Sequence, residues 1–252
     1  MKFKLATPEN EHIIAAFVNS HKNSKIYHTI AWKKIIQATY GYKPVYILLL
    51  DKDDLVGFLP LFLVRGMTGK KRLVGLPYSH MVHPLARDES VQEVLLSRAE
   101  EIAEKYHAEY IQLKCEVKAK GNQWQHKRFY HDSVLDLQQD MGDILKNFKS
   151  STRRNIKKAQ KSGITMRTGD CPKDFNDFYE LIVETRKRQG SPPYSKTFFH
   201  QLYERLKPEQ MQLHLALYQN RPIAGIIMLY HGLDAIYAYG ASVSDNVLLR
   251  MR

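Results

Sequence analysis

The segment PVYILLLDKDDLVGFLPLFLV, residues 44–64, decides the fold of this 252-residue chain. It contains two apolar runs, Val45–Leu50 and Leu55–Val64, with the polar residues Asp51–Asp54 between them. Two apolar runs joined by a short polar turn predict a β-hairpin. A third strand is predicted at Arg72–Leu76, so this part of the chain is expected to form a three-stranded meander.

Two predicted helices precede this meander, because apolar residues recur at helical spacing over residues 11–20 and 30–39. The same order, two helices and then three strands, occurs again further along the chain. The elements of this second copy are predicted at Phe175–Gln189, Thr197–Leu206, Gln212–Tyr218, Ile223–Tyr230 and Ala235–Ala241. The sequence therefore predicts an α/β fold of two tandem units, residues 1–140 and 141–252.

The first copy is longer than the second. After its third strand, an amphipathic helix is predicted at Ser90–His107, followed by strands at Glu109–Cys115 and Ser133–Leu137. The second copy has only residues 242–252 in the corresponding place, so we expect its unit to be truncated at the C-terminus. We favour a fragment of a longer protein; an edge supplied by a partner is the alternative.

The composition indicates a folded, basic protein. The chain has 38 Lys and Arg against 26 Asp and Glu, a formal charge of +12, and 44% hydrophobic residues, which excludes a disordered class. No apolar stretch reaches the roughly 18 residues of a membrane span, and the N-terminus lacks the apolar core of a signal peptide. We expect a cytoplasmic protein with an anionic partner: nucleic acid, a phosphorylated cofactor, or the anionic lipid at the inner face of the membrane.

Several common catalytic and metal-binding motifs are absent from the sequence, including G-x-S-x-G, the Walker loop, G-x-G-x-x-G and H-E-x-x-H. Cys115 and Cys171 lie far apart and near no histidine cluster, so neither a disulfide nor a thiolate metal site is expected. His80 and His83 could bind a metal, but no acidic or sulfur ligand lies nearby in the sequence. We expect no metal site and no permanently bound cofactor.

The segment Ile144–Gly169 is the most informative part of the chain for function. It has no acidic residue and eight basic ones, Lys146, Lys149, Arg153, Arg154, Lys157, Lys158, Lys161 and Arg167. Because like charges repel at helical spacing, a compensating anionic ligand is favoured over a solvated helix. We predict that Arg153, Arg154 and Lys157 contact phosphate groups. The opposite side of the helix is expected to face a core and comprises Leu145, Phe148, Thr152, Ile156 and Ala159.

The same segment begins a resemblance to a known family. SSTRRNIKKAQKSGITM (residues 150–166), followed by FYELIVETRKRQGSPPYSKTFF (178–199), resembles the FemAB-type branch of the acyltransferase superfamily. LALYQNRPIAGIIMLYHG (215–232) and IYAYGAS (236–242) follow in the expected order. Three segments in the first half of the chain also resemble this family: YHTIAW (27–32), LVGFLPL (55–61) and GLPYS (75–79). The resemblance is diffuse, but it extends along most of the chain.

The resemblance implies a pair of GNAT-like units, which have the acyl-CoA N-acyltransferase fold and agree with the duplication. It also implies transfer of an acyl group to an amine. The peptidoglycan members take an amino acid from aminoacyl-tRNA and attach it to a cell-wall precursor. An acyl-CoA-dependent N-acetyltransferase acting on a polysaccharide precursor or a small amine is the alternative. A non-catalytic RNA-binding module is an alternative of another class.

The sequence departs from the family pattern in two ways, and both limit what function can be inferred from the resemblance. The peptidoglycan enzymes carry basic residues for the diphosphate of the precursor at two positions, which are occupied here by Ile36 and Tyr194. Lys33 and Lys34 lie close to Ile36 in the sequence. The acetyl-CoA loop of ordinary acetyltransferases has only a loose match at Gln160–Thr165. That match leads into a predicted strand rather than a helix, so its backbone amides would not converge on a pyrophosphate.

The remaining predicted substrate-binding residues are aromatic or polar. Tyr237 and Tyr239 share one face of a strand and could line the groove where donor and acceptor meet, with packing on the sheet as the alternative. Trp32, Tyr78 and Ser79 are predicted to line an acceptor cleft in the first unit, and for Trp32 a core position is the alternative. No catalytic base is predicted, because aminoacyl esters are reactive enough for positioning to suffice.

Overall fold

The computed structural model describes residues 1–80, 83–116, 124–127, 131–206 and 208–244. Its contacts divide into two compact units that are interleaved along the chain. Unit 1 comprises Met1–Trp124, Tyr194–Met211 and Met228–Tyr237, and unit 2 comprises Gln125–Pro193, Gln212–Ile227 and Ala238–Arg252. The sequence-based division into residues 1–140 and 141–252 stays a prediction.

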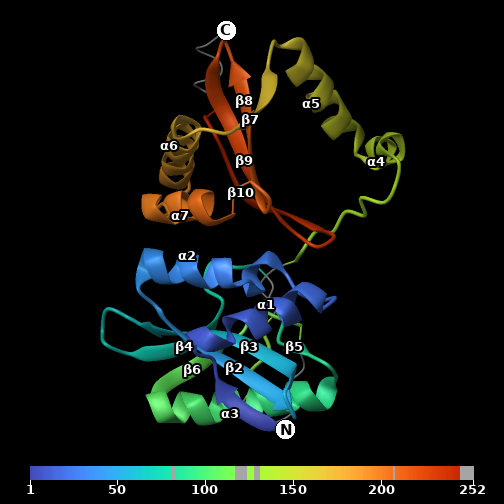
Figure 1. Cartoon of the computed structure of the whole chain (residues 1–252). Helices are drawn as coiled ribbons and strands as arrows, with labels where there is room; N and C mark the ends of the chain where they lie inside the picture. The colour runs from blue at the N-terminus through green and yellow to red at the C-terminus, as the bar shows by residue number, and fades with distance from the viewer. Residues whose placement is uncertain (81–82, 117–123, 128–130, 207, 245–252) are drawn as a thin grey trace. The chain divides into compact units, whose positions relative to one another are not determined.

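The first sheet has the strand order β1-β2-β3-β4-β6, and β5 pairs with β3. Three helices accompany it, with α3 on one face and α1 and α2 on the other (Figure 1). β4 and β6 are parallel, and the other pairs are antiparallel. The element bounds are β1 Lys2–Leu5, α1 Glu11–Ser20, α2 Ile30–Tyr40, β2 Lys43–Asp51, β3 Asp54–Arg65, β4 Lys71–Gly75, β5 Leu85–Ala86, α3 Glu89–Tyr106 and β6 Ala108–Gln112.

The predicted hairpin and the predicted long helix are both confirmed. β2 and β3 pair from Lys43↔Leu63 to Asp51↔Asp54, with Lys52 at φ 56° in the tight turn. The apolar side of α3 packs on this sheet, because its side chains at helical spacing join the buried strand residues in one core. The buried residues of α3 are Val91, Leu95, Leu96, Ala99, Ile102 and Ala103.

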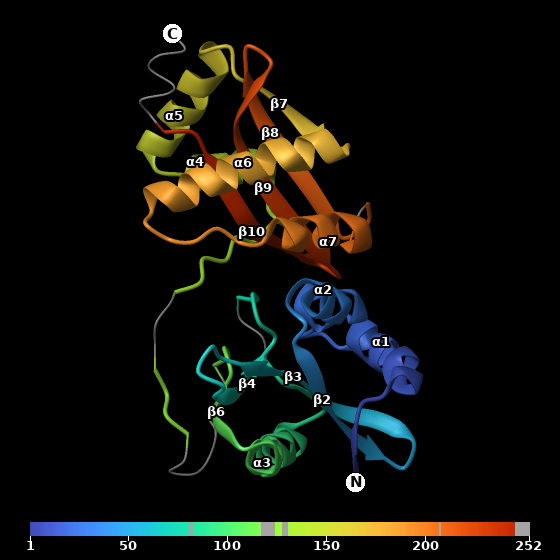
Figure 2. The same ribbon diagram turned by 90° about the vertical axis from the view of Figure 1, so that its left-hand side faces the viewer.

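The second sheet has the strand order β10-β9-β8-β7, and α6 lies across one face of it (Figure 2). This packing is close, because a Cβ atom on Gly225 of β9 would lie 2.7 Å from Cδ2 of Phe178 on α6. A side chain at residue 225 would therefore force the helix away from the sheet. The element bounds are α4 Met141–Asn147, α5 Ser150–Lys161, β7 Thr165–Gly169, α6 Pro172–Arg188, α7 Lys196–Leu206, β8 Met211–Tyr218, β9 Arg221–His231 and β10 Asp234–Ser242.

The two sheets repeat one topology, so the predicted duplication and α/β fold class are confirmed. Each begins with a short strand, continues through two helices and ends in three strands that follow in order. The first strand pairs antiparallel with the first strand of the meander in both cases, β1 with β2 and β7 with β8. The strand β1 was not predicted, and it completes the repeat of six elements.

Two sequence-based predictions are wrong. Residues 133–137 do not form a strand, and Val134 is 94% exposed. Apolar alternation alone cannot form a strand when no neighbouring strand pairs with it, and no described residue pairs with this segment. The apolar side of α5 does not enter a core either, because none of its described residues is buried and Ile156 is 37% exposed.

An ion pair fastens β7 to the first turn of α6. Asp174 is 1% exposed, and its carboxylate accepts hydrogen bonds from the Arg167 guanidinium and from the backbone N–H of Asp170 at 3.1 Å. The hydrogen bonds from Arg167 hold the pKa of Asp174 well below its usual value. Asp174 therefore stabilises the fold above the pKa of an unfolded aspartate, and this contribution is lost as the pH falls through the depressed pKa.

We predict that Arg167→Met lowers the free energy of unfolding by about 2 kcal/mol at pH 7, because it leaves a buried carboxylate without its main partner. Desolvation then raises the pKa of Asp174, so the deficit should shrink as the pH approaches 4. Urea unfolding followed by circular dichroism at several pH values measures this. Lys173→Met is the control, because it breaks the pair between the exposed Lys173 and the partly exposed Asp177 and should cost less than about 0.5 kcal/mol. Equal losses in both variants would contradict the prediction.

Candidate functional site

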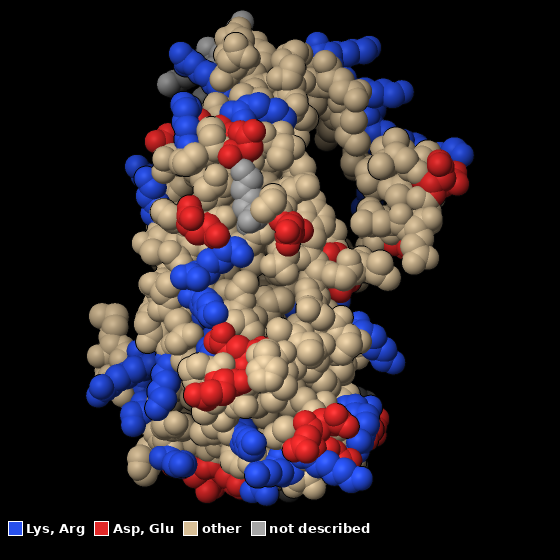
Figure 3. Space-filling model, viewed as in Figure 1, with Lys and Arg blue, Asp and Glu red and all other residues tan. Residues whose placement is uncertain are grey.

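The helix α5 presents a dense positive surface, formed by Arg153, Arg154, Lys157, Lys158 and Lys161 and called here the basic face. All five side chains are exposed, and within the described residues none of them forms an ion pair. Arg153 donates one hydrogen bond, from Nη1 to the backbone oxygen of Lys146 at 2.9 Å. Blue side chains mark α5 at the upper right of Figure 3. The basic face is therefore available to an anionic ligand.

The local structure of α5 leaves its positive charge uncompensated. Its N-cap residue Lys149 makes no side-chain hydrogen bond, and its first turn has no acidic residue. Arg153 and Arg154 come directly after that turn, near the positive end of the helix dipole, where cations are unfavourable. An anion bound at this surface would relieve both the dipole effect and the repulsion between the cations.

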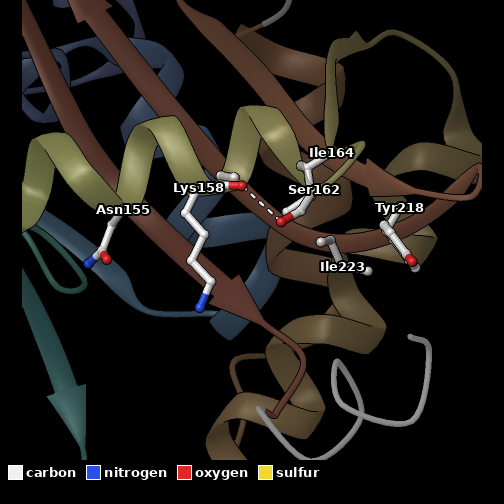
Figure 4. Close-up of a pocket in the computed structure, with 7 residues that line it drawn as sticks. Asn155, Lys158, Ser162, Ile164, Tyr218 and Ile223 are labelled. Atoms are coloured by element: carbon white, nitrogen blue, oxygen red, sulfur yellow. Dashed lines mark hydrogen bonds between the residues drawn. The ribbon is translucent and has the colours of Figure 1, made fainter.

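A pocket of about 470 Å³ lies beside the C-terminal half of α5. Figure 4 shows the Asn155 and Lys158 side chains extending from the same side of α5, with Tyr218 and Ile223 at the other end of the site. Ser162 donates a hydrogen bond from Oγ to the backbone oxygen of Lys158 at 2.8 Å. The lining residues are Asn155, Lys158, Ala159, Ser162, Ile164, Tyr218 and Ile223.

The β7–β8 register explains how this pocket forms. Thr165 pairs with Leu217, so Ile164 and Tyr218 are neighbours at one end of the sheet although 54 positions separate them. The helix ends at Ser162, and Gly163 turns the chain into β7 with a φ of 75° that favours glycine. The pocket was not predicted from the sequence, because only the strand register brings its two sides together.

In unit 1, two of the predicted acceptor residues are part of an aromatic cluster. The ring of Trp32 is fully buried, and it contacts Tyr27 and Phe198 edge to face, with centroids 4.7 and 6.0 Å apart. Tyr78 stacks on Tyr40 at 4.3 Å and also contacts Phe198. The indole Nε1 of Trp32 is buried with no hydrogen-bond partner in the described part of the chain. Such donors are candidates for hydrogen bonds to a ligand.

The loop that carries Tyr78 and Ser79 has a strained backbone. Leu76 and Tyr78 adopt φ values of 41° and 63°, which are rare for residues other than glycine. Ser79 is buried, and its hydroxyl donates to the backbone oxygen of Leu76. Strain of this kind is frequent in loops that position a ligand. The structure thus brings Trp32, Tyr78 and Ser79 into one region of unit 1, and their binding role stays a prediction.

Lys114 is a further candidate that sequence reasoning missed. Its Nζ donates to the backbone oxygen of Ser79 at 3.0 Å, and desolvation lowers its pKa. No sequence motif marks Lys114, because it reaches this loop only through the parallel pairing of β4 and β6. A partly desolvated ammonium group with two further N–H donors can bind a carboxylate or a phosphate.

The histidines near this loop have structural partners. Nδ1 of His80 lies 2.6 Å from the hydroxyl of Tyr27, and Nε2 of the fully buried His28 lies 2.9 Å from the backbone oxygen of His83. Desolvation lowers the pKa of His28 to about 4, so its imidazole is neutral at pH 7. Both contacts join the loop to the helical turn Ile26–His28.

The two predicted tyrosines of β10 differ in exposure. Tyr237 is 60% exposed and Tyr239 is 5% exposed, although both have the same parity along the strand. Tyr237 is therefore open to a ligand and Tyr239 is packed. Nothing in the described part of the chain assigns either tyrosine a role in binding, so both stay predictions.

The positions that depart from the family pattern carry no charge toward a ligand. Ile36 is fully buried in α2, and the ring of Tyr194 packs on Phe198 and Phe199.

One cluster of the described residues has the side-chain types of a metal site, because ligand atoms of Asp170, Cys171 and Asp174 lie within 4.8 Å of one another. Asp174 is already engaged by Arg167, so the cluster has an internal counter-ion.

Comparison with known proteins agrees with the predicted resemblance. Residues 119–222 match the model of the FemAB family, and this range includes all of α5. A crystal structure of FemX is 16% identical and has a TM-score of 0.68, covering 100% of this chain and 83% of its own. A conserved protein of unknown function from Bacteroides thetaiotaomicron is 12% identical, with a TM-score of 0.57 and coverage of 96% and 80%.

The family match confirms the resemblance to FemAB over residues 119–222, and the two solved structures show that the fold is shared. The search of curated proteins found no match. Among the helices of the described residues, none has the length and apolar character needed to cross a bilayer.

Proposed function

We propose that this chain is an N-acyltransferase of FemAB type that transfers an aminoacyl group from aminoacyl-tRNA to an amine of a cell-wall precursor or a similar acceptor. The observation that carries the proposal is the basic face of α5, whose cations have no ion-pair partner in the described residues and which lies inside the segment matched by the FemAB model. We expect this activity in the cytoplasm, where aminoacyl-tRNA is found.

The basic face supports a phosphate-rich donor. Arg153, Arg154 and Lys157 lie on one side of α5 and would bind phosphates without reading the base sequence. The reaction forms an amide bond between the acceptor nitrogen and the carbonyl carbon, and it breaks the ester bond to the tRNA. The leaving 3′-oxygen takes up a proton, and the amine loses one. Because the ester is activated, holding the amine in line with the carbonyl supplies much of the rate.

The aromatic cluster of unit 1 supports an acceptor with a polar, partly anionic group. Trp32 offers a buried donor without a protein partner in the described part of the chain, and Lys114 offers a cation beside the Ser79 loop. Together with Tyr78 and Ser79, they would hold the acceptor and exclude water. Tyr237, the exposed tyrosine of β10, is a further proposed contact.

A competition experiment tests the donor. Fluorescently labelled alanyl-tRNA is bound to the full chain at fixed salt and displaced by uncharged tRNA or by acetyl-CoA. We expect alanyl-tRNA to bind about tenfold more tightly than uncharged tRNA, because contacts with the aminoacyl group add roughly one hydrogen bond's free energy.

Each alternative gives a different result in this experiment. Displacement by acetyl-CoA alone would assign the chain to an acyl-CoA-dependent N-acetyltransferase. Equal affinity for charged and uncharged tRNA, with a steep dependence on salt, would assign it to a non-catalytic RNA-binding module. Either outcome would overturn the proposed donor.

A further inference from the structure

The pocket beside α5 has apolar side chains on two sides. The ring of Tyr218 and the side chains of Ile164 and Ile223 come from the strand ends, and Ala159 comes from the helix. Ile223 is buried, whereas Tyr218 and Ile164 are partly exposed. The volume of about 470 Å³ is within the range of small-molecule sites. A ligand group with an apolar face would contact these side chains.

The polar side chains that line the pocket carry either a positive charge or no charge. Lys158 contributes an ammonium group, Asn155 a side-chain amide and Ser162 a hydroxyl oxygen, and no lining residue is acidic. The ligand should therefore present acceptors or negative charge to these side chains. Lys158 is exposed, so its ammonium group is available to an anionic group of the ligand.

The pocket is continuous with the basic face of α5. Lys158 belongs to both, and at 3.6 residues per turn it lies about 40° around the helix from Arg154. Arg154 and Lys161 lie about 6 and 4.5 Å along the helix axis from Lys158, one on each side. A cationic row beside an aromatic wall is the arrangement by which proteins bind single-stranded nucleic acid, with phosphates on the cations and bases on the aromatic rings.

We propose that this pocket holds one unpaired base of single-stranded RNA against Tyr218, while the flanking phosphates lie on Arg154, Lys158 and Lys161. The inference rests on the proposed function, since an aminoacyl-tRNA carries its amino acid on a single-stranded 3′ end. It adds a base-binding subsite to the phosphate contacts of the basic face.

The test compares two labelled tetranucleotides, an RNA ending in CCA and an abasic oligonucleotide with the same phosphates. Fluorescence anisotropy measures their affinity for the full chain at fixed salt. We expect the RNA to bind at least about fivefold more tightly than the abasic probe. Tyr218→Ser should remove this difference and leave the affinity for the abasic probe unchanged, whereas Lys158→Gln should weaken the binding of both probes.

Tyr110→Ser is the matched control, because Tyr110 is an exposed tyrosine on β6 that does not line the pocket. Circular dichroism checks that every variant is folded. Equal affinity of the wild-type chain for both probes, or no binding of either, overturns the base subsite. The alanyl-tRNA competition judges the proposed function separately, so a preference for the charged tRNA without base dependence would reject the pocket and retain the function.

Discussion

The combined substitution of Arg153, Arg154 and Lys157 by alanine is expected to weaken tRNA binding on the order of 10²-fold at 0.1 M salt. Each phosphate contact contributes roughly 0.7–0.9 to the slope of log affinity against log salt, so losing three contacts should reduce that slope by roughly 2–3 units. The three side chains are exposed and have no ion pairs within the described residues, so the free energy of unfolding should stay unchanged or rise slightly. A salt titration of tRNA binding measures both quantities.

A matched triple variant distinguishes binding at the basic face from a general effect of net charge. Lys22→Ala, Lys105→Ala and Lys187→Ala remove the same three positive charges from exposed positions outside α5. We expect this control to weaken binding only a few-fold, through the change in net charge. If both triple variants lose affinity equally, the basic face is no site and α5 is a solvated helix in a basic protein.

The sheets and long helices could be predicted because their patterns are local. The apolar runs of residues 45–50 and 55–64 are long, and the helical spacing of residues 90–107 extends over several turns. Strand β1 has only four residues, so its sequence lacks a run long enough to mark it. Residues 133–137 have the composition of a strand, but a strand requires a neighbour, and pairing depends on distant parts of the chain.

The candidate site also has residues that could be predicted from the sequence and residues that could not. The cations of α5 could be predicted, because a dense run of Lys and Arg at helical spacing must be exposed whatever the rest of the fold is. The walls of the pocket could not, since Ile164 and Tyr218 become neighbours only through the register of β7 and β8. Lys114 likewise reaches Ser79 only because β6 lies beside β4.

Trp32→Ala is expected to lower the free energy of unfolding by about 3–5 kcal/mol. The indole is fully buried and contacts Tyr27 and Phe198 edge to face, so its removal leaves a large cavity and ends both ring contacts. Urea unfolding followed by circular dichroism measures the loss. Ile35→Val on the same helix is the control, and because it deletes one methylene from a fully buried side chain it should cost about 1 kcal/mol.

Trp32→Phe distinguishes a core residue from one that also binds the acceptor. Because Nε1 has no protein partner in the described part of the chain, replacing the indole by a phenyl ring breaks no internal hydrogen bond, and most of the ring packing is kept. We therefore expect Trp32→Phe to lower the free energy of unfolding much less than Trp32→Ala does. If Nε1 donates to the acceptor, the loss of one hydrogen bond raises the acceptor KM by about two- to tenfold, with Ile35→Val as the reference for a small packing change. An unchanged KM in a folded Trp32→Phe variant would make Trp32 a core residue only, and the acceptor contacts would then rest on Tyr78, Ser79 and Lys114.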